Sequence, residues 1–213
     1  MRESVGNAPP PDTPTPGRPR RFDTAAVLES ALELFWKRGY HTTTTRELER
    51  YLGVNQSSLY NVFGTKQALL DAALDRYETL TTGALLGPLE DSESGLQAIE
   101  KFFSDLAHWV TRDGRRGCML INMMAEDGTA TESIKRRTRD YRKRVKLALK
   151  DSLQRAVANG EVAVDDLDQR ASLLLGMVLG YNIAARGGAS KQELQALLGA
   201  VNAQLSSWRC AQA

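Results

Sequence analysis

Apolar residues recur every three or four positions along most of the chain, with polar residues between them. This spacing predicts amphipathic helices, because one face of a helix repeats about every 3.6 residues. Helices are expected over 24–38, 45–52, 56–63, 66–82, 95–112, 130–158, 166–186 and 191–208. Only residues 161–164 resemble a strand, and they are too few to build a sheet. The pattern therefore predicts an all-α fold.

Residues 44–64 contain the signals for two short helices joined by a tight turn. Thr44 and Glu47 have the spacing of a capping box, which starts the first helix. Gly53 ends that helix, because glycine takes a left-handed turn without steric cost. Asn55 can cap the second helix, which ends at Gly64. A helix, a glycine-containing turn and a second short helix form a helix-turn-helix unit.

The second of these helices carries polar, uncharged side chains on the face away from its apolar residues. Asn and Gln side chains can form paired hydrogen bonds with adenine, and Ser can bond to several bases. Nearby hydroxyl and basic groups suit phosphate oxygens, and Arg46 could reach a guanine or a phosphate. The predicted DNA-binding residues here are Thr44, Thr45, Arg46, Asn55, Gln56, Ser57, Ser58, Tyr60, Asn61 and Lys66. The alternative is an ordinary helical hairpin with a polar surface.

Residues 24–70 resemble the N-terminal domain of the TetR family of bacterial transcriptional regulators. The resemblance rests on LFWKRGY (34–40), TTRELERYLGV (44–54), SSLYNVF (57–63) and GTKQALL (64–70). It implies a DNA-binding domain followed by a helical domain that binds a small effector and forms a dimer. Glu49 departs from the family, which usually has a small alanine where the two helices approach. The Glu49 side chain must therefore turn outward or find a partner.

The chain before the first helix is rich in proline, with five prolines in residues 1–17, and we expect it to be disordered. Arg18 and Arg20 follow, and they resemble an arm that enters a narrow minor groove. A solubilising basic linker is the alternative. The predicted domains are a basic, proline-rich arm at 1–21, a helix-turn-helix domain at 22–66, and a helical effector-binding and dimerisation domain at 67–213.

Composition and charge further restrict the class of protein that this chain can be. With 213 residues and a net charge of +2, the chain must bind nucleic acid through a local basic patch. Cys118 and Cys210 have no metal-ligand spacing and fit a reducing cytosol. No stretch reads as a membrane span or a secretion signal. His41 and His108 are isolated, and no catalytic or cofactor motif occurs. We therefore expect a cytoplasmic protein that needs no cofactor and is not an enzyme.

The segment 117–127 contains three methionines and Cys118, whose polarizable side chains adapt to varied apolar shapes. These side chains could fill the core, or they could line an effector pocket with Asn122 as its polar group. A third hypothesis makes Cys118 a redox or electrophile sensor, with Arg115 and Arg116 lowering its thiol pKa. The tentative ligand-binding residues, which suit an apolar or aromatic molecule, are Phe103, Trp109, Cys118, Asn122, Met123, Met177 and Tyr181.

The predicted helix 130–158 is strongly basic. Its cations could form a solvated face neutralised by acidic neighbours, a second surface for DNA, or a site for an anionic effector. The sequence leaves these three interpretations open.

The predicted helix 166–186 is apolar on nearly every side, and Gly176 and Gly180 permit close approach of another helix. Together with the last helix, this helix carries more apolar surface than one subunit can cover. Exposed apolar patches of that size are typical of interfaces. The predicted dimer-interface residues are Leu174, Met177, Tyr181, Leu194, Leu198, Val201 and Leu205. We expect a homodimer formed through a four-helix bundle, which the resemblance also implies.

These features together indicate a homodimer that binds double-stranded DNA at a palindromic operator, with one recognition helix in each half-site. The resemblance implies a repressor that a small molecule releases from the operator. The alternative is a regulator that responds to redox state or electrophiles through Cys118.

Overall fold

The computed structural model describes residues 22–112, 117–125 and 131–210. Within these ranges the chain is almost wholly helical, and apart from one isolated bridge no strand forms, so the all-α prediction is confirmed. No helix in the described ranges is long and apolar enough to cross a membrane. The predicted contacts Arg18 and Arg20, and the cations Arg115 and Arg116, lie outside the described residues.

The helices follow the predicted order, with two additions, one after the fourth predicted helix and one after the fifth. They are α1 (Thr24–Arg38), α2 (Thr45–Leu52), α3 (Gln56–Phe63), α4 (Lys66–Tyr77), the π-helix η1 (Glu78–Thr82), α5 (Gly83–Glu90), α6 (Leu96–Arg112), α7 (Met119–Ala125), α8 (Glu132–Ala158), α9 (Leu167–Arg186) and α10 (Lys191–Ser207).

Short-range capping bonds fix the ends of the first helices. Asp23 accepts a hydrogen bond from the Ala25 N–H (2.9 Å) at the start of α1. Thr44 and Glu47 form the predicted capping box at the start of α2. Gly53 ends α2 in the left-handed region, with φ of 64°. These positions match the predictions because a cap depends on side chains only a few residues apart.

The predicted end of the fourth helix near Thr82 is wrong. The backbone stays helical through η1 and α5, and Gly83 has an ordinary helical φ of −61°. Pro88 lies inside α5 and removes the N–H that would bond to the carbonyl of Ala84. Both residues are exposed, so water can solvate that carbonyl and the helix continues to Glu90.

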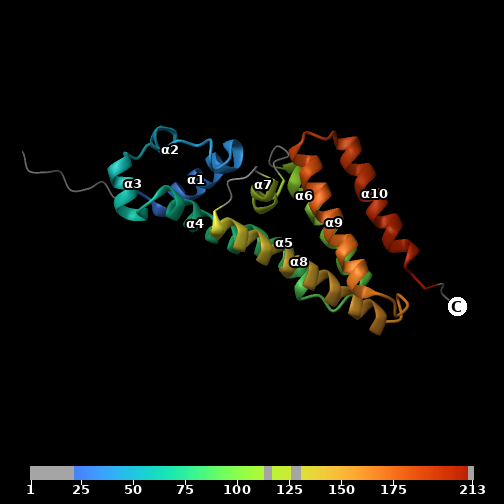
Figure 1. The fold of residues 1–213 in the computed structure, drawn as a ribbon. Coiled ribbons are helices and arrows are strands. Elements are labelled where there is room, and N and C mark those ends of the chain that lie inside the picture. Colours follow the sequence, from blue (N-terminus) through green and yellow to red (C-terminus); the bar gives the residue numbers. More distant parts are fainter. Residues whose placement is uncertain (1–21, 113–116, 126–130, 211–213) are drawn as a thin grey trace, which may run out of the picture.

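Two groups of helices lie at opposite ends of this continuous rod of α4, η1 and α5 (Figure 1). Helices α1 to α3 gather at one end, and α9 and α10 lie at the other. Helix α8 runs beside α5 and packs against α9, while α7 lies between the two groups. The rod thus belongs to both halves, so a movement of the larger half can be transmitted to α1 to α3.

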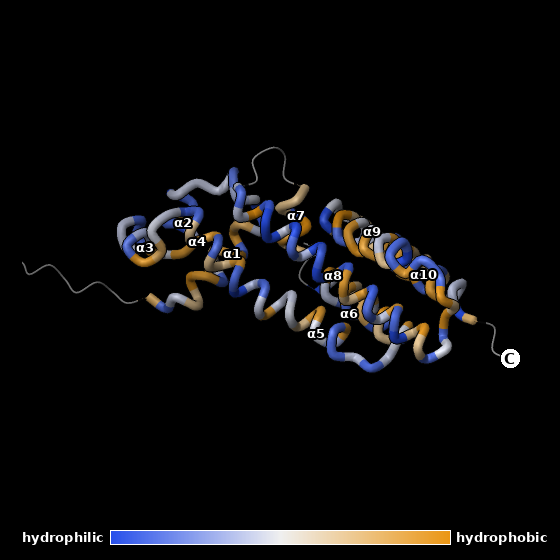
Figure 2. Tube along the Cα trace, turned by 60° about the horizontal axis from the view of Figure 1, so that its bottom comes forward, coloured by the Kyte–Doolittle hydropathy of each residue, from blue (hydrophilic) through white to orange (hydrophobic). Residues whose placement is uncertain are grey.

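One hydrophobic core connects the two halves. It includes Leu48 and Leu59 of α2 and α3, Leu70 and Leu74 of α4, and Leu149 of α8, none of which has exposed surface. Figure 2 shows hydrophilic positions along much of α8 and hydrophobic positions along α9. The polar surface of α8 and the apolar surface of α9 are therefore the features outside the core that need a functional explanation.

Candidate nucleic-acid interface

Helix α3 presents a polar face to solvent. Gln56, Ser57 and Asn61 are exposed, as predicted for residues that read bases, while Ser58 and Tyr60 are half-buried. Sequence reasoning missed Val62, whose side chain is 55% exposed on the same short helix. An exposed apolar group on a recognition helix can contact the methyl group of thymine. The signal was available, because Leu59 and Phe63 already supply the core-facing positions.

Two of the predicted DNA contacts have a structural role in this structure. The Asn55 side chain accepts hydrogen bonds from the Ser58 N–H (2.8 Å) and the Ser57 hydroxyl (2.9 Å), which caps α3. The Thr44 hydroxyl accepts from the Glu47 N–H (3.2 Å) and caps α2. Substituting either residue would therefore change helix stability as well as any contact with DNA.

The remaining predicted contacts surround the start of α2 and α4. The Thr45 and Tyr60 hydroxyl oxygens lie 3.1 Å apart, and this bond sets α3 against α2. Arg46 is exposed in the first turn of α2 and can reach outward. The Lys66 ammonium lies 4.3 Å from the centre of the Tyr40 ring, in a cation–π contact. Partial burial lowers the pKa of Lys66, so the cation is held in place at the cost of some hydration.

Glu49 finds a partner, one of the two outcomes that the sequence allowed. Its carboxylate accepts a hydrogen bond from the Gln56 N–H (3.4 Å) at the first residue of α3. A negative charge is favourable at a helix N-terminus, where backbone N–H groups lack partners. Glu49 therefore joins the two helices of the unit at the point where a small alanine is usual in the family.

Aromatic side chains connect this unit to the larger half. Trp36 of α1 packs edge-on against Tyr77 of α4, with ring centres 5.3 Å apart, and against Trp109 of α6 at 5.8 Å. Trp109 was a tentative ligand-binding residue, and it borders a surface groove of about 430 Å³ beside η1 and α5. It therefore lies both at a groove and at the contact between the two halves.

The other predicted ligand-binding residues lie in different surroundings. Met123 borders a groove between α7 and α8, and Met177 and Tyr181 border a third depression, between α9 and α10. Phe103 and Asn122 are buried in the core of the larger half. The sequence did not separate these surroundings, because Met, Cys and aromatic residues look alike in sequence whether they fill a core or line a pocket.

Cys118 is buried in a polar cluster beside α4. The Tyr77 hydroxyl accepts from the Met119 N–H (3.2 Å) and donates to the Cys118 sulfur (3.4 Å). The Asn182 side chain accepts from the Cys118 N–H (2.7 Å) and donates to the Val178 carbonyl (2.8 Å). Burial raises the pKa of the Cys118 thiol, which is opposite to the shift that a reactive sensor requires.

The predicted interface residues divide between the core and the surface. Leu174, Leu194 and Leu205 have almost no exposed surface, because they pack inside their own subunit, as do Tyr181 and Val201. Only Met177 and Leu198 are partly exposed. The exposed apolar residues of α9 and α10 are instead Leu173 (45%), Ile183 (42%) and Leu197 (41%).

A helix-turn-helix unit with a polar recognition helix, joined by a helical rod to a larger helical domain, defines a DNA-binding transcriptional regulator. Comparison with protein families gives the particular family. Residues 27–73 match the model of bacterial regulatory proteins of the tetR family, and residues 95–201 match a tetracyclin repressor-like C-terminal domain. The chain belongs to the TetR family.

Individual relatives agree with this assignment. The HTH-type transcriptional repressor ComR of Escherichia coli (strain K12) is 30% identical over 190 residues, covering 86% of this chain and 89% of ComR. A cysteine mutant of the TetR family regulator CifR, solved with 26-base-pair operator DNA, is 25% identical with a TM-score of 0.77. The match covers 90% of this chain and all of that one. Reduced E. coli NemR shares the fold at 21% identity, a TM-score of 0.74 and coverage of 89% and 98%.

Proposed function

We propose that this protein is a homodimeric repressor that binds a palindromic operator and is released from it by a small molecule. The observation that carries the proposal is the exposed polar face of α3, whose helix is capped and packed so that Gln56 and Asn61 project outward. Repression is the function in the name of ComR, and operator DNA is the partner in the CifR structure. Both support the same role for this chain.

The proposed dimer forms through α9 and α10. Leu173, Ile183 and Leu197 expose apolar surface there, and a Cβ added to Gly176 or Gly180 would meet no atom within 4 Å. Nothing in the subunit therefore approaches these glycines, and a partner helix can pack closely against them. This face replaces the buried leucines as our proposed contact surface.

Two-fold symmetry would place two α3 helices in successive major grooves, about 34–36 Å apart or a multiple of that distance. A ligand weakens operator binding only if it binds better to subunits with a different spacing. A coupling free energy of about 1–3 kcal/mol, common in allostery, would weaken binding by about 5- to 150-fold. The continuous rod of α4, η1 and α5 is the element that can transmit this change.

Selection from a random DNA pool tests the proposal, followed by anisotropy titrations at several salt concentrations. Gln56→Ala and Arg46→Ala should each cost about 1–3 kcal/mol at particular base pairs of the selected site. Asn61→Ala tests a second residue on the same exposed face of α3. Gln154→Ala on α8 is a matched control far from α3. Equal affinities of the α3 and α2 variants and the wild type for every sequence would contradict the assignment.

Catalysis is not part of the proposal, since the family to which the chain belongs is one of regulators. Turnover of a bound small molecule by the purified protein would contradict this part. The alternative role of Cys118 as a redox or electrophile sensor is less well supported, because the thiol is buried and its pKa is raised.

A further inference from the structure

A groove of about 400 Å³ lies between α7 and α8, and its inner wall is apolar apart from the buried Thr138. Met123 of α7 and Ile134 of α8 form its most buried part, and Met124 is half-buried beside them. Methionine side chains adapt to apolar groups of different shape. This volume lies within the range of small-molecule sites, which are about 300–1,000 Å³.

The outer edge of the groove is cationic, because Lys135, Arg139 and Arg142 all border it and are exposed. Among the residues that the structure describes, no acidic side chain borders this groove. Among the described residues, Lys135 and Arg142 have no ion pair, and the nearest carboxylate oxygen to Arg139 is that of its neighbour Asp140, at 3.9 Å. An anion at this edge would therefore meet Lys135 and Arg142, which have no ion pair among the described residues, and Arg139, whose contact with Asp140 is long.

Several other cations of α8 are paired with acidic residues. Arg144 forms a paired contact with Glu90 (2.6 and 2.7 Å), and Lys146 and Lys150 both bind Asp168 (2.8 and 3.3 Å). For these residues the interpretation of α8 as a face neutralised by acidic neighbours is confirmed. It does not account for the cations at the groove.

We propose that this groove binds an amphipathic carboxylate, with its apolar body against Met123 and Ile134 and its carboxylate between Arg139 and Arg142. Guanidinium groups suit a carboxylate because they offer paired N–H donors in one plane. The site differs from the pocket expected from the sequence, since its charged edge selects an anion rather than a neutral aromatic molecule. The inference rests on the proposed function in treating this ligand as the effector.

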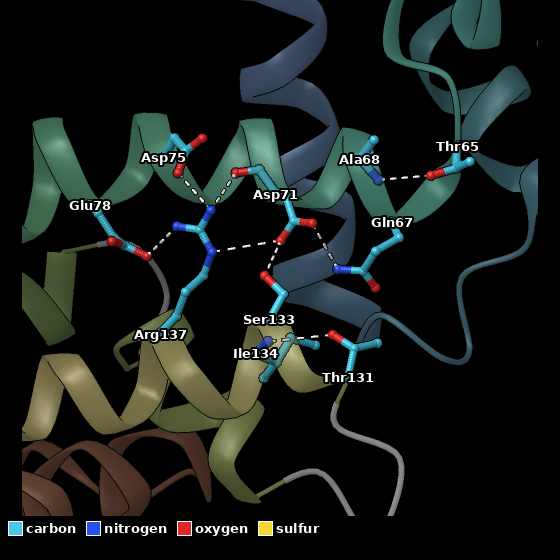
Figure 3. Close-up of polar contacts among 10 residues, drawn as sticks. All are labelled: Thr65, Gln67, Ala68, Asp71, Asp75, Glu78, Thr131, Ser133, Ile134 and Arg137. Carbon is cyan, nitrogen blue, oxygen red and sulfur yellow. Dashed lines mark hydrogen bonds and ion pairs between the residues drawn. The ribbon is translucent and has the colours of Figure 1, made fainter.

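The turns of α8 that line the groove also form polar contacts with α4 (Figure 3). Arg137 contacts three acidic residues along the rod, with nitrogen–oxygen distances of 2.6 Å to Asp75, 2.9 Å to Glu78 and 3.6 Å to Asp71. The Ser133 hydroxyl donates to Asp71 at 2.6 Å. Ile134, which borders the groove, lies between these two residues in sequence. A shift of this part of α8 therefore moves groups that are bonded directly to α4.

The other wall of the groove is tied to the same helix. The Tyr77 hydroxyl at the end of α4 accepts from the Met119 N–H at the start of α7. Both α7 and α8 thus contact α4 through specific polar bonds. A ligand that changes the separation of α7 and α8 would change the position of α4, and with it the recognition helix that packs against α4.

Calorimetric titration of the full-length protein tests binding without DNA. The probes are sodium octanoate, octanol and octylammonium, which share an apolar body and differ in charge. Octanoate should bind at least about tenfold more tightly than the other two. The double variant Arg139→Gln/Arg142→Gln should lose this preference. The matched control Arg136→Gln/Lys143→Gln removes the same charge from exposed positions of α8 that do not border the groove, and should keep it.

Three results would overturn the proposed site: no binding of octanoate, equal affinity for octanoate and octanol, or equal losses in the two double variants. The basic surface could instead serve DNA. Weaker DNA binding by Arg139→Gln/Arg142→Gln in the absence of octanoate, with octanoate binding unchanged, would assign it to DNA and also overturn the proposal.

Operator titrations with and without octanoate test the coupling. Octanoate should weaken operator binding of the wild type by at least about fivefold. Arg137→Met and the milder Ser133→Ala should bind octanoate normally and show a smaller effect on DNA. Octanoate that binds but leaves the operator affinity of the wild type unchanged would refute the role as effector. If no operator can be selected at all, the proposed function fails, while the calorimetric result still decides whether the groove binds the carboxylate.

Discussion

Replacing Gly180 by arginine should separate the stability of one subunit from its association with another. Gly180 lies inside α9, and a Cβ added there would meet no atom within 4 Å. Glycine in a helix interior is less favourable than alanine by about 1 kcal/mol. The substitution should therefore preserve or increase the helical stability of the isolated subunit.

The same substitution should weaken the dimer strongly. In the proposed interface the new guanidinium would face apolar groups such as Met177 and Leu197, which lie beside Gly180. A buried charge without a partner costs about 3–5 kcal/mol. Since about 1.4 kcal/mol corresponds to a factor of ten in Kd, the Kd of the dimer should rise by about 100-fold to several thousandfold. Operator affinity should fall with it, because the two recognition helices would no longer bind as one unit.

Sedimentation equilibrium over a range of concentrations measures the dimer, and circular dichroism reports whether the helices remain. Gly180→Ala should remain a dimer, because it adds only a methyl group. Gln195→Arg is the control for the added charge. It places the same charge at an exposed position of α10, two residues before Leu197 and therefore about 200° around the helix from it. If Gly180→Arg keeps the dimer and operator affinity of the wild type, the α9–α10 face is not the interface.

Four further predictions concern single residues. Lys66→Ala should weaken binding to all DNA sequences alike and reduce the slope of log affinity against log salt by about one; anisotropy titrations check this, and an unchanged slope would rule out a phosphate contact. Asn182→Ala leaves the buried Cys118 N–H without an acceptor, so urea titration should show a loss of about 1–3 kcal/mol in the free energy of unfolding; an unchanged value would show that the bond contributes nothing. A thiol reagent should modify exposed Cys210 much faster than Cys118 in the folded protein, and equal rates would contradict the burial of Cys118. Because burial raises the pKa of Cys118, the unfolded chain loses this proton first, so the unfolding free energy should fall as pH rises above the ordinary thiol pKa of 9.0.

Features that depend on neighbouring residues were predictable from the sequence. The capping box of Thr44 and Glu47, the cap at Asn55 and the turn at Gly53 all appear in the structure. Their geometry depends on residues within three or four positions of each other. The polar face of α3 was predictable for the same reason, because helical spacing alone determines which side chains point away from the core.

Features that depend on packing between distant segments were not predictable in this way. A glycine and a proline near the end of the rod indicated a break, yet the exposed carbonyl of Ala84 can be solvated and the helix continues past Pro88. Helix α9 has apolar residues on most of its surface, so the sequence did not separate Leu174, which faces its own core, from Leu173, which faces outward. The contacts of Arg137 with α4 and η1 join residues about 60 positions apart, and the pattern of charges did not reveal them.

Whether two subunits bind the operator as one symmetric unit can be measured by counting the chains on DNA selected by the full-length protein and then changing the half-site spacing. We expect a symmetric site that binds two chains and loses affinity when about five base pairs, half a helical turn, are inserted at its centre. A site without symmetry that binds one chain, or an affinity that does not change with spacing, would contradict this expectation.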